Sequence, residues 1–63
     1  MVYTVKQCRV GMNLTQKKMA EALKISAHTY AKYEKSPELM TIKLAKSFSE
    51  VTGISIEDIL FAN

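Results

Sequence analysis

Apolar side chains recur at helical spacing along most of the chain, and strand-like alternation is confined to the first five residues. Recurrence at every third or fourth position places these side chains on one face of a helix. We expect five helices: about Thr4 to Gly11 or Met12, Gln16 to Leu23, Ala27 to Lys35, about Thr41 to Thr52, and a short one after Ser55. The predicted fold class is all-α.

Capping residues mark the expected helix ends. Thr15 and Ser26 offer side-chain oxygens in front of the second and third helices, and Ser55 with Asp58 resembles a capping box for the fifth. Asn13 tolerates the left-handed conformation that ends a helix.

The apolar positions predict the core. The expected inward side chains are Val5, Cys8, Met12, Met19, Ala20, Leu23, Tyr30, Tyr33, Ile42, Ala45, Phe48 and Val51. Tyr30 and Tyr33 stand three positions apart, opposite a polar face, which favours core packing over the alternative of stacking on single-stranded nucleic acid.

Residues 16–35 match a helix-turn-helix pattern, in which a turn of about three residues joins two helices and a small residue lies where they cross. Ala20 is that small residue. The outer face of the second helix of such a pair is free to enter a DNA major groove, which is about 12 Å wide.

At about 100° per residue, four side chains fall within an arc of about 100° opposite the tyrosines: His28, Ala31, Lys32 and Lys35. Lys32 can donate to guanine O6 and N7, His28 can donate or accept at a base edge or phosphate, and Thr29 suits a phosphate. Small side chains allow close approach and can touch a thymine methyl. The candidate DNA-contacting residues of this helix are Ala27, His28, Thr29, Ala31, Lys32 and Lys35.

Charge supports this assignment. Residues 1–35 carry seven basic and two acidic groups, a net +5, whereas the remainder carries −2. The helix at 16–23 opens with Gln16, Lys17 and Lys18, although the helix dipole disfavours basic residues there. A DNA phosphate bound at the free N–H groups explains this arrangement, and the alternative is that the exposed lysines point away from the axis.

Composition excludes several classes of protein. A domain of 63 residues has no room for a deep catalytic cleft, and Cys8 and His28 are each the only residue of their type, so we expect no metal site, cofactor or enzymatic activity. No apolar run approaches the length of a membrane span. We expect residues 1–63 to form a single cytoplasmic domain with no evident small-molecule ligand.

The run LTQKKMAEALKIS from Leu14 to Ser26, followed by Thr29-Tyr30, Tyr33-Glu34 and the closing GISIEDIL, resembles the phage repressor and Cro-like family of xenobiotic-response-element regulators. The resemblance implies a five-helix, lambda-repressor-like fold and a dimer on palindromic operator DNA. It also implies roles for individual residues: a backbone contact for Gln16, base reading for Ala27, His28 and Lys32, and an internal ion pair for Arg9 and Glu34. Lys24 departs from the glycine that is common at its position in the family.

The sequence therefore predicts a transcription regulator that binds double-stranded DNA sequence-specifically. Repression is favoured over activation. The alternative is an antitoxin or protein-interaction adaptor with the same fold. A homodimer is expected, with Ile56, Leu60 and Phe61 as candidate contacts, although Phe61 can instead fold back onto its own core.

Overall fold

Four α-helices make up most of the chain in the computed structural model, which describes residues 1–62. They are α1 (Val5–Gly11), α2 (Gln16–Leu23), α3 (Ala27–Lys35) and α4 (Ile42–Thr52), with 3₁₀ turns at Pro37–Leu39 and Ile56–Asp58 and two strands, β1 (Tyr3–Thr4) and β2 (Ile59–Leu60). The first four predicted helices are confirmed, each to within one residue of its expected ends.

Each α-helix begins at a hydroxyl residue that caps it. The side-chain oxygens of Thr4, Thr15, Ser26 and Thr41 accept the backbone N–H three residues ahead, at 3.0 to 3.1 Å. Each bond satisfies a donor that has no partner within the helix. At Thr4 the cap is reciprocal, because Gln7 Oε1 accepts the Thr4 N–H at 2.9 Å.

Three residues with positive φ end the helices: Asn13 at 58°, Lys24 at 62° and Gly53 at 72°. At the end of α2, the Lys24 N–H donates to the Glu21 carbonyl at 3.1 Å, and the next N–H donates to Ala20 at 3.0 Å. This pair of bonds is a Schellman motif, which satisfies carbonyls at the helix end. The motif turns the chain sharply toward α3.

The core lies where the four helices meet. Its buried side chains are Val5, Cys8, Met19, Ala20, Leu23, Tyr30, Phe48 and Ile59. The rings of Tyr30 and Phe48 stack with their centres 6.5 Å apart, which joins α3 to α4. Tyr33, by contrast, is only half-buried.

The prediction of a core position is wrong for two residues. Met12 is 43% exposed because it lies just past the last turn of α1, and Ile42 is 78% exposed at the first turn of α4. A spacing of three drifts by about 60° per step around a helix, so Ile42 and Val51 cannot share one face. Leu44 packs against the core instead of Ile42.

The predicted fifth helix is also wrong. Residues 56–58 form a single 3₁₀ turn, the Ser55 side chain makes no capping bond, and residues 59–60 are extended. They pair in parallel with β1, Tyr3 opposite Ile59 and Thr4 opposite Leu60, so the fold is mostly but not wholly helical. Ile59 is buried and Leu60 is exposed, which is the alternation of a strand.

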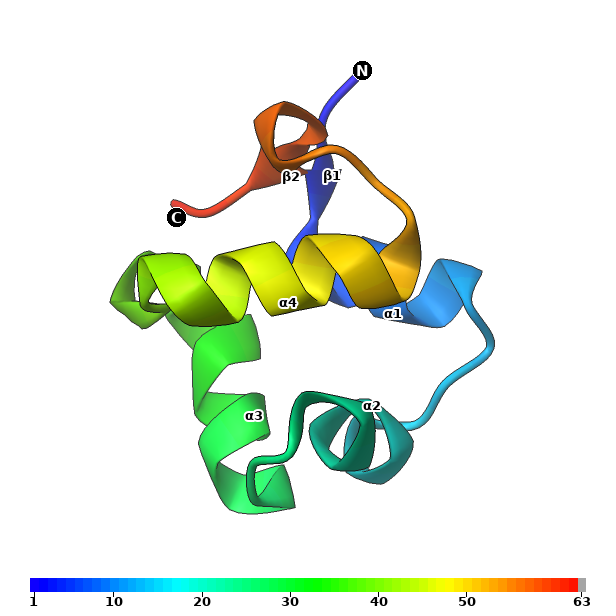
Figure 1. Ribbon diagram of the computed structural model, residues 1–63, viewed down its shortest axis with the longest axis vertical. Coiled ribbons are helices and arrows are strands. Elements are labelled where there is room, and N and C mark those ends of the chain that lie inside the picture. Colours follow the sequence, from blue (N-terminus) through cyan, green and yellow to red (C-terminus); the bar gives the residue numbers. More distant parts are fainter. Residues whose placement is uncertain (63) are drawn as a thin grey trace.

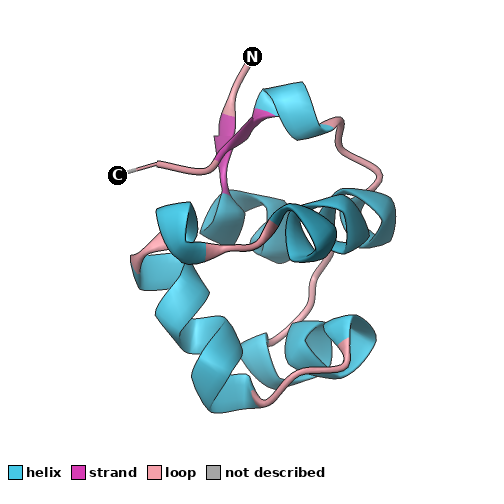
Figure 2. Cartoon of the chain, turned by 60° about the vertical axis from the view of Figure 1, so that its left-hand side comes forward, coloured by secondary structure: helices cyan, strands magenta, loops and turns pink. Residues whose placement is uncertain are grey.

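Helix α4 crosses the middle of the molecule, with α2 and α3 on one side and the paired strands on the other (Figure 1). The view turned by 60° shows the same separation (Figure 2). Within residues 1–62, no helix is long and apolar enough to cross a membrane.

Candidate nucleic-acid interface

Helices α2 and α3 pack directly against each other as a helix-turn-helix unit. Ala20, the small residue that the sequence predicts for the helix crossing, is buried in the core on α2. Three residues, Lys24 to Ser26, separate the two helices. Tyr30 is fully buried against Phe48, so the opposite face of α3 is turned away from the core.

The outward face of α3 is polar and basic. Ala27, His28, Lys32 and Lys35 are exposed there, while Ala31 is partly covered. Thr29 is also partly covered and lies four positions before Tyr33, nearer the tyrosine side of the helix. The Thr29 hydroxyl is also bound locally, because it accepts the Ser26 hydroxyl at 2.8 Å. No carboxylate of residues 1–62 forms an ion pair with the two lysines. Their charges are therefore available to an external anion.

The start of α2 adds a second group of exposed polar side chains. Gln16, Lys17 and Lys18 occupy its first turn, which contains no acidic residue. Lys18 Nζ lies 3.8 Å from Glu21 Oε1 in a solvent-exposed pair, whereas Lys17 has no ion pair within residues 1–62. Of these two lysines, Lys17 is the one whose charge is not partly neutralised.

An ion pair between Arg9 and Glu34 joins α1 to α3. Arg9 Nε donates to Glu34 Oε2 at 2.5 Å, and their side chains are only 12% and 6% exposed. Arg9 Nη1 also donates to the Leu14 carbonyl at 2.7 Å, in the segment that leads into α2. This pair therefore links the first three helices.

Gln16 is part of the same network, which the sequence alone did not indicate. Its Nε2 donates to Glu34 Oε1 at 3.0 Å. Burial alone would raise the pKa of Glu34, but the groups around it, Arg9, the nearby Tyr30 hydroxyl and Gln16, outweigh burial and lower that pKa. Glu34 is therefore ionised at neutral pH.

The Tyr30 hydroxyl is buried beside this network. Burial, reinforced by the Glu34 carboxylate, raises the pKa of Tyr30 well above its usual value. Nevertheless, the Tyr30 hydroxyl forms no hydrogen bond with any atom of residues 1–62. Tyr30 therefore stabilises the core through burial and stacking of its ring.

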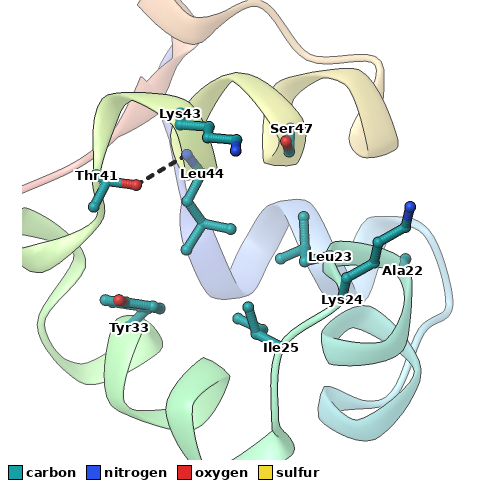
Figure 3. A pocket seen from close by; sticks show the side chains of 9 residues that line it. All are labelled: Ala22, Leu23, Lys24, Ile25, Tyr33, Thr41, Lys43, Leu44 and Ser47. Atoms are coloured by element: carbon teal, nitrogen blue, oxygen red, sulfur yellow. Dashed lines mark hydrogen bonds between the residues drawn. The ribbon is translucent and has the colours of Figure 1, made fainter.

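An open hollow of about 610 Å³ lies between the α2–α3 turn and the start of α4. Leu23, Ile25 and Leu44 converge in it (Figure 3), with Lys24 and Lys43 also on its lining. None of the expected DNA-contacting residues is among its lining residues in the described part of the chain. The hollow and the polar face of α3 are separate surfaces.

The three candidate dimer residues lie in and beside the 56–60 segment. Ile56 and Leu60 are 41% and 42% exposed, whereas Phe61 is partly buried and packs against the core.

Residues 1–62 contain no group of three His, Cys, Asp or Glu side chains placed to hold a metal ion.

Comparison with protein families agrees with this geometry. A family model described as helix-turn-helix matches residues 5–59, which run from the start of α1 into β2. Searches of curated proteins and of solved structures found no match.

Proposed function

The chain belongs to the Cro/C1-type helix-turn-helix family of DNA-binding transcription regulators, and we propose that it acts as a repressor that occupies an operator. Membership confirms the family resemblance of the sequence. Occupying an operator excludes the polymerase without any further activity of the protein.

One observation supports the proposal above all others. The face of α3 that points away from the buried Tyr30 carries exposed basic side chains, and none of them is neutralised by a carboxylate of residues 1–62. Lys17, in the first turn of α2, adds a cation that forms no ion pair among residues 1–62. A phosphate backbone and a major groove together complement such a surface.

We assign separate roles to the residues of this surface. Lys32 and His28 read base edges, and Ala27 and Ala31 allow the helix to approach thymine methyl groups. A larger set positions the protein on phosphates: Gln16, Lys17, Thr29 and Lys35.

The test is selection of bound duplexes from random DNA, followed by binding measurements on two variants. Lys32→Ala should lose about 1 to 3 kcal/mol on the selected site and relax preference at one or two base pairs. Lys17→Ala should weaken all duplexes alike and reduce the salt slope by about one.

Equal losses on selected and random DNA for Lys32→Ala would contradict its reading role. If the wild-type chain shows no salt-dependent DNA binding, the proposal fails and the protein-interaction adaptor becomes the better explanation. A palindromic selected sequence would support a homodimer whose recognition helices lie about 34 Å apart.

A further inference from the structure

The side chain of Gln16 is exposed at the start of α2, yet it is held by a carboxylate from another helix. Its Nε2 lies 3.0 Å from Glu34 Oε1, and Glu34 is fixed in turn by Arg9. The Glu34 side chain is 6% exposed, so this anchor is largely withdrawn from solvent.

The chemistry of this contact determines which way the amide faces. An ionised carboxylate only accepts hydrogen bonds, so it must receive the NH₂ side of the Gln16 amide. One Nε2 hydrogen is used by Glu34. The second hydrogen belongs to the same exposed side chain and is left as a donor.

The ion pair removes an electrostatic obstacle to this arrangement. A free carboxylate beside a DNA phosphate would repel it, but Arg9 donates to Glu34 through Nε at 2.5 Å and Nη2 at 3.5 Å. Arg9 is itself anchored on the Leu14 carbonyl. Glu34 can therefore orient Gln16 while its own charge is balanced.

We propose that Glu34 is a positioning residue for DNA binding, which holds the Gln16 amide so that its second N–H donates to a phosphate. This inference rests on the proposed function, because it assumes that α2 lies on the DNA backbone. Glu34 itself touches no DNA. Its effect on affinity passes through Gln16.

A double-mutant cycle on a short random-sequence duplex tests this role. Gln16→Met removes the donor and should weaken binding about ten- to a hundredfold. Glu34→Gln is isosteric but offers both a donor and an acceptor, so it no longer dictates the amide orientation. It should weaken binding about two- to tenfold, because the freed side chain must then be ordered on binding.

In the Gln16→Met background, Glu34→Gln should cause no further loss of affinity, whereas thermal unfolding without DNA should show destabilisation in both backgrounds, because Arg9 loses its carboxylate partner in each. An equal loss of affinity in both backgrounds would overturn the proposal. A wild-type chain that does not bind DNA would instead refute the proposed function, and the positioning role with it.

The wild-type protein provides a second readout if Glu34→Gln does not fold. In the side-chain amide NMR signals of Gln16, one Hε2 proton should show hydrogen bonding without DNA, and the other should shift when DNA is added. Two Hε2 signals that match a free glutamine, with or without DNA, would overturn the proposal.

Discussion

At the scale of single residues, Glu34 and Lys24 occupy positions that cost free energy in isolation. Glu34 is a carboxylate almost fully withdrawn from water, and Lys24 has a left-handed backbone with φ of 62°. The first cost is offset by hydrogen bonds from Arg9 and Gln16. The second is offset by the Schellman motif that Lys24 completes.

The depressed pKa of Glu34 predicts acid sensitivity. Its contribution to stability is fully present above its ordinary pKa of 4.5 and is lost as the pH falls through the lower pKa of the folded state. Urea unfolding of wild type and Glu34→Gln, from neutral pH to about pH 3, should show the difference between them shrinking on acidification. A constant difference over that range would contradict this assignment.

Lys24 predicts a stabilising substitution. Lys24→Gly removes the Cβ that makes φ of 62° unfavourable, and it should raise the free energy of unfolding by about 0.5 to 1 kcal/mol. Lys24→Ala is the matched control, because it removes the same charge but keeps a Cβ. Thermal unfolding should show a gain for glycine only; equal gains for both would mean that charge, not backbone strain, limits this site.

At the scale of elements, the N-caps distinguish true helices from the 3₁₀ turn. Four α-helices begin at hydroxyl residues that make their capping bond, whereas Ser55 makes none before the turn at Ile56–Asp58. An oxygen that accepts a backbone N–H lowers the free energy of the first helical turn. A serine that lacks this bond contributes little to the stability of the turn that follows it.

This difference predicts unequal effects of two similar changes. Thr15→Ala should lower the free energy of unfolding by about 1 kcal/mol, because the Lys18 N–H loses its acceptor. Ser55→Ala should stay within about 0.5 kcal/mol of wild type, as for other surface substitutions. Chemical denaturation of both variants makes the comparison, and a loss at Ser55 as large as at Thr15 would show a capping bond there in solution.

Local patterns were sufficient for α2 and α3, because Thr15, Ser26 and the apolar face act within a few residues. They failed at 56–60, where Ile56, Ile59 and Leu60 suit a helical face as well as a strand. The strand has its partner at Tyr3–Thr4, 56 positions earlier, and no local pattern reports such a pairing.

The same limit applies to the candidate interface. Exposed residues on α3 follow from helical periodicity, but the bond between Gln16 and Glu34 depends on how α2 and α3 cross.

At the scale of the whole molecule, the candidate DNA-contacting residues and the candidate dimer residues lie on different elements. The candidate lysines lie on α2 and α3, while Leu60 is exposed on β2 and Ile56 is exposed on the 3₁₀ turn just before it. In Figure 1 these strands lie across α4 from the helix-turn-helix unit. A second copy bound at the strands would leave α3 free for DNA.

We therefore predict a dimer at micromolar concentration that Leu60→Asp converts to a monomer, measured by sedimentation. The substitution should preserve the fold, because Leu60 already faces solvent. Val10→Asp, on the exposed side of α1, is the control and should leave the dimer intact. Phe61→Ala should lower stability instead, since Phe61 packs on its own core. A wild-type monomer, with and without DNA, would refute the dimer.

The pairing of β1 with β2 also sets an expected order of folding. Contacts between α2 and α3 form within residues 16–35, whereas the strands join positions 56 residues apart and close nearly the whole chain into a loop. Loop closure costs entropy that grows with length, so short-range contacts form at lower cost. We therefore expect the helix-turn-helix unit to assemble first and the two strands to pair last, and the strands to separate before α2 and α3 do.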